Sequence, residues 1–232
     1  MKNIVICGAS KNLGYYLFKK LDSSNNVYLL SRSKIKHKYF IKTDMSNSKQ
    51  SIGALHKIKK KFKKIDAIIF CIGNSKKNYK NFPNIKDFNK SFSENFYPLV
   101  NLINSYLINY NNKPVKIIAI SSIAGVKNIN APITYSVAKN ALNFYVSILA
   151  RELATSNINL NIISPGNILM KNNNWDKMLR KNKKHTLNYI KKNVPNNKFC
   201  DPSDVLNICK LLIENENNFV GSNIIVDGGQ IL

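Results

Sequence analysis

Close to its start the chain contains the stretch Asn3-Ile4-Val5-Ile6-Cys7-Gly8-Ala9-Ser10-Lys11-Asn12-Leu13-Gly14. Residues 3–7 form a short and almost entirely apolar run, which is typical of a buried strand. A glycine-containing turn follows directly, and residues 13–20 then have helical spacing. A strand, a glycine turn and a helix in this order can hold a phosphate group against the first backbone N–H groups of the helix.

The turn has the features that a dinucleotide phosphate site requires. Gly8 permits a tight turn and Gly14 permits close packing of the helix on the strand, whereas Asn12 stands where a middle glycine is common. Asparagine tolerates left-handed backbone conformation better than most residues, so we expect the turn to survive. Such turns also occur in purely structural loops. The candidate cofactor contacts in this stretch are Gly8, Ser10, Lys11, Asn12, Leu13 and Gly14.

Apolar and amphipathic segments alternate along the rest of the chain. Further strands are predicted at residues 27–30, 67–71, 115–120, 160–163 and 224–226, and helices at residues 52–62, 88–110, 134–155 and 202–213. Fully apolar strands between helices indicate a parallel sheet that is covered on both faces. We therefore expect an α/β fold, namely a single doubly wound Rossmann-type domain over residues 1–232 with a mostly parallel seven-stranded sheet and helices on both faces.

The end of the second strand bears on the choice of cofactor. Sites for NAD usually have an acidic residue there, which binds the ribose 2′-hydroxyl. This chain has Ser31 and Arg32 instead, and Lys11 adds a second positive charge from the first turn. An acid would repel a 2′-phosphate, whereas these residues would bind it, so we expect NADP(H). The alternative is that both cations are ordinary surface residues.

The chain is strongly basic. Thirty-six Lys and Arg face 12 Asp and Glu, which gives a formal net charge of +24. Such a charge attracts polyanions at low salt. However, the lysines are spread along the whole chain, no nucleic-acid-binding motif accompanies them, and a compositional bias accounts for them equally well. We expect no specific nucleic-acid partner.

Cysteine usage and hydropathy indicate the compartment. The four cysteines show neither a C-x-x-C pair nor ligand-like spacing with the three histidines, so we expect reduced thiols and no metal site. The apolar run at the N-terminus is too short for a signal peptide. No stretch reaches the ~18 apolar residues of a membrane-spanning helix. These features predict a soluble, cytoplasmic protein with no membrane association.

Polar residues that carry chemistry recur in a fixed order downstream. Ser121-Ser122-Ile123-Ala124-Gly125 follows a predicted strand, Tyr135 and Lys139 begin a predicted helix, and Ser164-Pro165-Gly166 follows the next strand. Together with the first turn, the spacing of thirteen residues from Ser122 to Tyr135 and a late Val226-Asp227-Gly228-Gly229, this order resembles the short-chain dehydrogenase/reductase family over almost the full length. The similarity is to its 3-oxoacyl-(acyl carrier protein) reductase-like branch.

The resemblance implies an NADP(H)-dependent exchange of hydride between nicotinamide and a carbonyl or secondary alcohol. Tyr135 would be the general acid/base, and Lys139, one helical turn away, would lower the phenol pKa and bind the nicotinamide ribose. Ser122 would orient and polarise the substrate carbonyl. Asn95 matches a helix asparagine that supports a proton relay to the lysine in the family.

Other family positions are partly kept. Asp44 resembles the acid that accepts a hydrogen bond from adenine, with Met45 beside it. Phe70-Cys71-Ile72-Gly73 keeps the glycine of the family's Asn-Asn-Ala-Gly but loses both asparagines, which puts the usual side-chain hydrogen bonds there in doubt. The remaining cofactor contacts that the resemblance implies are Cys71, Gly73, Tyr135, Lys139, Pro165, Gly166 and Ile168.

Substrate recognition is expected in residues 123–131 and in a lid at about 167–195, a segment that varies within the family. The candidate substrate contacts are Ile123, Ala124, Ile129, Trp175 and Leu179. Lys171, Lys177 and Arg180 would either meet an anionic substrate or be solvated, and the sequence leaves both open. The substrate would be a small carbonyl compound, carrier- or nucleotide-linked in some family members.

The family implies a homotetramer built on the helices at residues 88–110 and 134–155 and on the C-terminal strand. The competing functional class is a non-catalytic NADP(H)-binding sensor or a polyanion-binding module. Degenerate members of that kind typically lose the tyrosine or the lysine, and this sequence keeps both.

Overall fold

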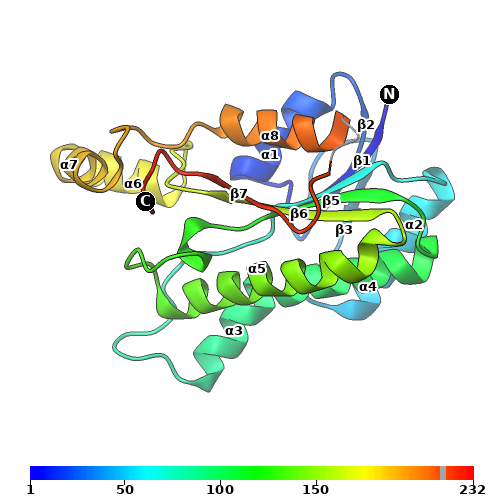
Figure 1. The fold of residues 1–232 in the computed structure, drawn as a ribbon, viewed down its shortest axis with the longest axis horizontal. Helices are drawn as coiled ribbons and strands as arrows, with labels where there is room; N and C mark the ends of the chain where they lie inside the picture. The colour runs from blue at the N-terminus through cyan, green and yellow to red at the C-terminus, as the bar shows by residue number, and fades with distance from the viewer. Residues whose placement is uncertain (215–217) are drawn as a thin grey trace.

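The computed structural model describes residues 1–214 and 218–232, which are organised around one parallel sheet (Figure 1). Within these residues seven strands lie in the order β3-β2-β1-β4-β5-β6-β7, and all six neighbouring pairs are parallel. The strands are β1 (Asn3–Cys7), β2 (Asn26–Ser31), β3 (Phe40–Lys42), β4 (Ala67–Phe70), β5 (Val115–Ile120), β6 (Ile158–Pro165) and β7 (Asn223–Val226). The predicted α/β class and doubly wound sheet are confirmed.

Helices cover both faces of the sheet. Figure 1 shows α1 and α8 on one side, and α3, α4 and α5 on the other. The helices are α1 (Asn12–Leu21), α2 (Ser48–Lys61), α3 (Ile85–Asn95), α4 (Tyr97–Tyr110), α5 (Ile133–Ala154), α6 (Asn174–Lys181), α7 (Lys183–Asn193) and α8 (Pro202–Glu214), with a short 3₁₀ helix η1 (Ile123–Gly125).

The core consists of two layers, one on each face. In β1, Ile4 and Ile6 pack with residues of α1 and α8, while Val5 and Cys7 pack with residues of α2, α4 and α5. Successive side chains of a strand point to opposite faces of the sheet. Because helices cover both faces, all four side chains are fully buried. This explains why the strand has no polar alternation, and each isoleucine buried in this way contributes about 1.5–3 kcal/mol.

The order of the strands creates the site. β1 lies between β2 and β4, so the chain runs outward from β1 in one direction and then returns to continue in the other. In such sheets ligands bind beyond the carboxyl ends of the strands at this point of reversal. Gly8, which follows β1, and Cys71, which follows β4, lie at this point.

Two elements differ from the sequence-based prediction. The helix predicted at residues 88–110 is wrong as a single helix, because α3 ends at Asn95 and α4 begins at Tyr97. Pro98 lies in the first turn of α4, where its missing N–H costs nothing, whereas inside a continuous helix it would remove a hydrogen bond. The strand β3 was not located in the sequence because it has three residues and lies at the sheet edge, where none of its side chains is buried.

The segment 167–195 contains two helices, α6 and α7, which Figure 1 places beyond the carboxyl ends of the strands. It is tied to the rest of the chain by a parallel bridge between Ile168 and Cys200 and by a hydrogen bond from Asn167 to Gln230. No residue of α6 is buried. Within this segment only α7 and the residues that follow it contribute buried side chains, namely Thr186, Ile190 and Val194.

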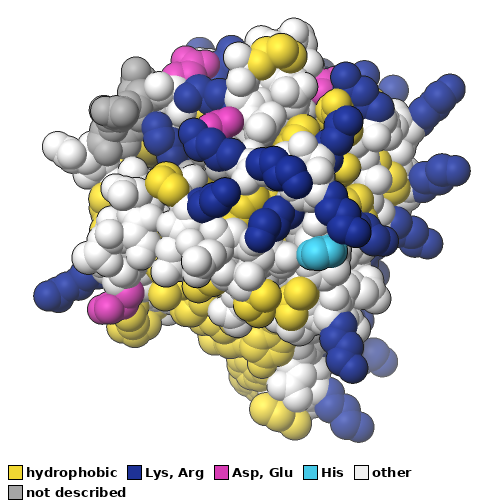
Figure 2. Space-filling view, turned by 90° about the vertical axis from the view of Figure 1, so that its right-hand side faces the viewer, with side chains coloured by type: hydrophobic (Ala, Val, Ile, Leu, Met, Phe, Trp, Pro, Cys, Tyr) yellow, Lys and Arg dark blue, Asp and Glu magenta, His cyan; other side chains and the backbone are white. Residues whose placement is uncertain are grey.

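Figure 2 shows one face of the molecule, on which lysine and arginine side chains are widespread and hydrophobic side chains gather in the lower part. On α4 and α5, Ile108, Phe144 and Ile148 are between 54% and 67% exposed. Among the described residues, no helix is both long enough and apolar enough to cross a membrane.

Candidate active site

The turn after β1 has the predicted geometry. Gly8 has a φ of +86°, and its N–H donates to the carbonyl of Leu30 at 2.8 Å. Asn12 adopts the left-handed conformation with a φ of +49°, as expected from its tolerance of that region. A side chain on Gly14 would place its Cβ 2.4 Å from the Gly8 carbonyl oxygen, so α1 can lie this close to the turn only with a glycine at position 14.

The start of α1 fits a diphosphate. Lys11 is the N-cap residue, and no side chain caps the helix. Ser10 and Leu13 are partly buried, whereas Lys11 and Asn12 are exposed. Uncapped N–H groups at a helix N-terminus, with positive charge beside them, favour an anion. The residues of this turn therefore fit the phosphates of a dinucleotide cofactor.

At the end of β2, Ser31 and Arg32 differ in their exposure to solvent. Ser31 is buried, and its hydroxyl donates to the carbonyl of Ser33 at 2.9 Å and accepts from the Ser33 N–H at 3.1 Å. Its side chain shapes the turn. Arg32 and Lys11 are both exposed, and neither forms an ion pair with any described residue. These two cations are the groups of this region that are available to a phosphate.

Asp44 and Met45 follow β3 but differ in accessibility. Asp44 is partly exposed, and its Oδ1 accepts from the N–H and hydroxyl of Ser46. Met45 is 2% exposed and packs in the core, while its carbonyl accepts from Asn101 at 2.9 Å. Asp44 can thus present a carboxylate oxygen to a ligand, whereas the side chain of Met45 is a core residue.

Cys71 and Gly73 form the floor of the site after β4. The Cys71 N–H continues the pairing of β4 with β1 by donating to the Cys7 carbonyl at 2.8 Å. Burial raises the pKa of the Cys71 thiol to about 12, although the nearby Lys139 charge opposes this. A Cβ on Gly73 would lie 3.2 Å from Asn95 Oδ1 and 3.3 Å from Lys139 Nζ. Two predicted catalytic side chains therefore converge on Gly73.

Ser122 and Tyr135 meet as the spacing predicted. Ser122 caps η1 by accepting from the Ala124 N–H at 3.1 Å, and it also hydrogen-bonds the Tyr135 hydroxyl. The contact depends on Gly125, where a Cβ would lie 2.6 Å from the backbone of Lys139. The missing side chain at position 125 allows η1 to pack directly on α5, so that the serine reaches the tyrosine.

Tyr135 lies in the first turn of α5, with a partly buried side chain. Burial raises the pKa of the phenol above its ordinary value, and the hydrogen bond with Ser122 lowers it in part. Desolvation is the larger of these two effects, so the phenol pKa is raised on balance. The phenol is thus held in its protonated form at neutral pH.

Lys139 lies one turn further along α5 and is 2% exposed. Its Nζ donates to the carbonyl of Ile120, the last residue of β5, at 3.0 Å. Burial lowers the pKa of this ammonium to about 8, partly offset by Cys71. A lysine with this pKa is mainly charged at neutral pH and becomes neutral in weakly alkaline solution.

Asn95 is fully buried at the end of α3. Its Oδ1 accepts from the Asn74 N–H at 2.8 Å, and its Nδ2 donates to the carbonyls of Ser91 at 2.9 Å and Asn74 at 3.2 Å. The side chain thus fixes the start of the loop after β4. Asn95 also lies beside Gly73 and Lys139, as the predicted role in a proton relay would require.

Pro165, Gly166 and Ile168 lie at and beyond the end of β6. The Gly166 N–H donates to Val226 at 2.9 Å, and a Cβ on Gly166 would lie 3.0 Å from Asp227. The Ile168 carbonyl accepts from Asn173 at 2.7 Å. The Val226-Asp227-Gly228-Gly229 motif therefore packs against the segment that leaves β6.

The predicted substrate contacts divide into two groups. Ile123 and Ala124 are 1% and 5% exposed, so the expectation that their side chains face a substrate is wrong. They are buried because η1 packs tightly on α5. Ile129 and Leu179 are partly exposed, and Trp175 stacks against Tyr189 and Phe199 at centroid distances of 5.3 and 5.6 Å.

The basic side chains of α6 are only partly available to a ligand. Arg180 forms an ion pair with Asp176 at 3.0 Å and donates a second hydrogen bond from Nε to the same carboxylate at 3.2 Å. Lys171 and Lys177 are exposed. The proposal that Arg180 meets an anionic substrate is therefore disfavoured, because its guanidinium already has a bidentate partner.

The sequence did not reveal the role of residues 74–84, which we call the strap. The strap connects β4 to α3 and reaches the start of the catalytic helix α5. The Tyr79 hydroxyl accepts from the Ile133 N–H at 2.8 Å, and Asn78 Oδ1 accepts from the Thr134 hydroxyl at 3.0 Å. These partners are 54 and 56 residues away in the chain, and no periodic pattern marks such contacts.

Comparisons with known proteins identify a matching family and relatives along nearly the whole chain. The family model described as enoyl-(acyl carrier protein) reductase matches residues 21–230. The chain is 28% identical to the 3-oxoacyl-[acyl-carrier-protein] reductase FabG of Buchnera aphidicola subsp. Baizongia pistaciae, over 100% of this chain and 98% of the relative.

Solved structures share the fold. ElxO with NADP bound has a TM-score of 0.87 and 24% identity, and the match covers 99% of this chain and 98% of that one. A short-chain dehydrogenase from Leptospira borgpetersenii with bound NAD+ has a TM-score of 0.84 and 24% identity over 100% and 93% of the two chains. At these identities the likeness establishes the arrangement of strands and helices.

Proposed function

The chain belongs to the short-chain dehydrogenase/reductase family, and from this premise we propose that it is an NADP(H)-dependent oxidoreductase acting on a carbonyl or secondary alcohol. The observation that carries the proposal is the hydrogen bond between Ser122 and Tyr135, with the Lys139 ammonium one helical turn away. These side chains come from two separate segments, the end of β5 and the start of α5. Their meeting is what acid catalysis at a carbonyl oxygen requires.

Tyr135 acts as the proton donor in the direction of reduction. The bound nicotinamide supplies the hydride to the carbonyl carbon, and the carbonyl oxygen then needs a proton. The phenol is protonated at neutral pH, and burial raises its pKa further above its ordinary value. The Ser122 hydroxyl orients the carbonyl and donates to the same oxygen, so that negative charge is stabilised where it develops.

Lys139 keeps a positive charge beside the phenol without contact with bulk water. Its hydrogen bond to Ile120 fixes the ammonium at the end of β5, next to Gly73. This charge favours the phenolate that remains after proton transfer. Asn95, which lies beside Lys139 next to Gly73, holds the Asn74 backbone and completes the proton path toward the lysine.

The carboxyl ends of the strands would hold the cofactor. The first turn of α1 would bind the diphosphate, Asp44 would accept from the adenine amino group, and the backbone around Cys71, Gly73 and Ile168 would contact the nicotinamide half. Arg32 and Lys11 select NADP(H) over NAD(H), since both are exposed and have no acidic partner among the described residues.

Residues 167–195 act as the substrate lid of a single domain spanning residues 1–232. The exposed apolar side chains of α4 and α5 support assembly into a homotetramer, because such surfaces commonly mark interfaces. Four free cysteines support a reducing, cytoplasmic location.

The test is a set of carbonyl compounds incubated with the wild-type protein and either NADPH or NADH. We expect oxidation of NADPH in equal amount to the alcohol formed, with a lower rate for NADH. Absence of alcohol from every compound would instead support the competing class, a non-catalytic NADP(H)-binding sensor or a polyanion-binding module. Faster turnover with NADH would contradict the assignment of Arg32 and Lys11.

A further inference from the structure

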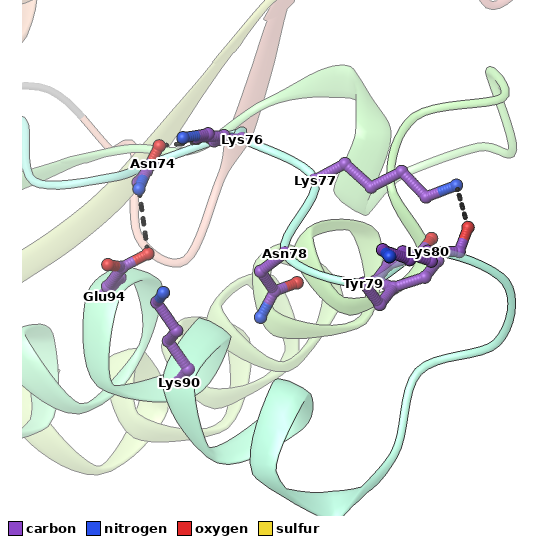
Figure 3. Close-up of a pocket in the computed structure, with 8 residues that line it drawn as sticks. All are labelled: Asn74, Lys76, Lys77, Asn78, Tyr79, Lys80, Lys90 and Glu94. Carbon is purple, nitrogen blue, oxygen red and sulfur yellow. Dashed lines mark hydrogen bonds between the residues drawn. The ribbon is translucent and has the colours of Figure 1, made fainter.

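A second hollow adjoins the catalytic residues. It lies between the strap and α3, has a volume of about 520 Å³, and is shown in Figure 3. Its lining residues are Asn74, Lys76, Lys77, Asn78, Tyr79, Lys80, Lys90 and Glu94. None of them belongs to the set that we assign to catalysis or to the cofactor. We call this hollow the strap pocket.

The charge of the strap pocket is unbalanced. Four lysines line it against a single acid, Glu94, and none of the four forms an ion pair with any described residue. Lys90 and Glu94 are one helical turn apart and so could pair. Glu94 instead accepts a hydrogen bond from Asn74 at 2.9 Å, which leaves the Lys90 ammonium without its natural partner (Figure 3).

The uncharged lining is fixed, and only the lysines are free to adapt. Asn78 donates to the Asp87 carbonyl at 2.9 Å and accepts from Thr134, while Tyr79 accepts from Ile133. Lys77 reaches the Lys80 carbonyl at 3.0 Å. The ammonium groups of Lys76, Lys80 and Lys90 accordingly remain available on a rigid frame, and their mutual repulsion would be relieved by an anion.

The strap pocket shares its wall with the catalytic site. Asn74, at its edge, is hydrogen-bonded to Asn95 in both directions and directly follows Gly73. At the other edge the strap binds Ile133 and Thr134, immediately before Tyr135. The strap pocket therefore borders the two segments that carry Asn95 and Tyr135.

We propose that the strap pocket binds a phosphate group, and that this group is the phosphate ester of the carbonyl substrate rather than a free phosphate ion. A phosphate ester carries a charge of about −1.5 to −2 at neutral pH and three acceptor oxygens, which suits several ammonium groups better than a single carboxylate would. The volume is ample for such a group. The assignment to the substrate rests on the proposed carbonyl reduction.

The first experiment compares a neutral ketone with its phosphate ester, for example dihydroxyacetone and dihydroxyacetone phosphate, by kcat/KM with NADPH. We expect the wild-type protein to prefer the ester by about tenfold or more, as expected for a few direct charge contacts. In Lys76→Ala/Lys90→Ala the preference falls at least about fivefold, while kcat/KM for the neutral ketone stays unchanged. An unchanged preference in this variant would overturn the proposal.

The matched control is Lys57→Ala/Lys60→Ala, which removes two exposed lysines from the outer face of α2. It lowers the net charge by the same amount. We expect it to keep the wild-type preference, because it leaves the strap pocket intact. An equal loss in both double variants would show that the preference comes from the overall charge of the protein, and would also overturn the proposal.

The source of the phosphate is tested with inorganic phosphate. We expect it to compete with the phosphorylated ketone and to leave turnover of the neutral ketone unchanged. Activation of neutral-ketone turnover by inorganic phosphate, lost in Lys76→Ala/Lys90→Ala, would make the ligand a free ion and contradict the assignment to the substrate.

A binding measurement tests the strap pocket independently of the proposed reaction. With the cofactor's own phosphate sites filled by saturating NADP+, titration calorimetry with inorganic phosphate at low salt should give heat of binding with wild type and with Lys57→Ala/Lys60→Ala, and much less with Lys76→Ala/Lys90→Ala. Equal heats in all three proteins, or none in wild type, would overturn the site. If no carbonyl compound is reduced, the proposed function fails while this titration still decides the pocket.

Discussion

The first turn of α5 and the helices α6 and α7 both lie beyond the carboxyl ends of the strands, yet the fold holds them very differently. The start of α5 is bound by the strap through Tyr79 and by α3 through a hydrogen bond from Ser91 to the Thr134 carbonyl at 2.9 Å. By contrast α6 buries no residue, and α7 buries only Thr186 and Ile190. The proton-transferring groups thus lie where the backbone is fixed from several sides, and the expected substrate contacts lie where it is not.

If this difference reflects function, changes at the start of α5 should affect the chemical step, and changes in α6 or α7 should affect substrate binding. The Ser122 and Ser121 pair gives the largest expected contrast. Ser122→Ala should lower kcat about 10²- to 10³-fold, because it removes a donor from the developing oxyanion. Ser121→Ala should leave kcat unchanged, since the buried Ser121 hydroxyl has no hydrogen-bond partner among residues 1–214 and 218–232.

Steady-state kinetics with one ketone and saturating NADPH would measure both serine variants. A similar loss in both would mean that the neighbourhood of η1 is sensitive for structural reasons. Equal rates for wild type and Ser122→Ala would remove the serine from the catalytic set.

The second expected effect is a pH dependence. Burial lowers the pKa of Lys139 to about 8, whereas the raised pKa of Tyr135 keeps the phenol protonated at that pH. Carbonyl reduction should therefore fall as the pH rises through about 8, by about tenfold for each further unit. Lys139→Arg, which stays charged, should be slower but lack this descending limb.

The pH effect is measured from initial rates of NADPH oxidation across neutral and alkaline pH. A limb that persists unchanged in Lys139→Arg would assign the ionisation to another group. The sign follows from the direction of the shift, because a lowered lysine pKa means that the required positive charge is lost earlier than in water.

A smaller effect is expected from the strap. Tyr79→Phe removes the acceptor for the Ile133 N–H at the start of α5, which has no side-chain cap from its own N-cap residue. We expect kcat to fall about three- to tenfold with little change in the KM for NADPH, since losing one such hydrogen bond costs about 1 kcal/mol.

Tyr97→Phe on α4 is the matched control, because the Tyr97 side chain is 43% exposed and its hydroxyl makes no hydrogen bond with a described residue. Its kcat should equal that of wild type. A loss of folding stability in Tyr79→Phe without a change in kcat would show that the strap supports the fold and does not position Tyr135.

The smallest effect on the chemical step is expected in the segment 167–195. Trp175→Ala breaks the contacts with Tyr189 and Phe199 and should raise the KM for the ketone a few-fold with kcat nearly unchanged, because lid contacts mainly hold the substrate. Leu187→Ala, which truncates a 45% exposed side chain of α7, serves as the control. A large fall in kcat for Trp175→Ala would contradict the assignment of the chemical step to the start of α5 and of substrate binding to α6 and α7.

The sequence predicted those features of the fold and the site that depend on residues adjacent in the chain. Fully apolar strands predicted the parallel sheet, and the conformational tolerance of Asn12 predicted its left-handed backbone, because each depends on neighbouring residues alone. The meeting of Ser122 with Tyr135 was expected from the family resemblance. The structure adds the reason, which is the absence of a side chain at Gly125.

Other features depend on contacts between distant segments and left no local signal. The strap reaches Ile133 across 54 residues, and the burial of Ile123 follows from the packing of η1 on α5. The raised pKa of Tyr135 also reflects tertiary burial, which outweighs the hydrogen bond with Ser122. The break between α3 and α4 did have a local signal, namely Pro98. The prediction of one continuous helix relied on helical spacing and did not take this proline into account.

The most direct test of the account compares wild type with Tyr135→Phe in the NADPH-dependent reduction of one ketone, with NADPH affinity measured in the same samples. Tyr145→Phe, on the same helix, provides the control for loss of a phenol. The account predicts a fall in kcat of about 10³-fold or more for Tyr135→Phe, with NADPH still bound and with Tyr145→Phe close to wild type. Reduction of the ketone by Tyr135→Phe at the wild-type rate would contradict it.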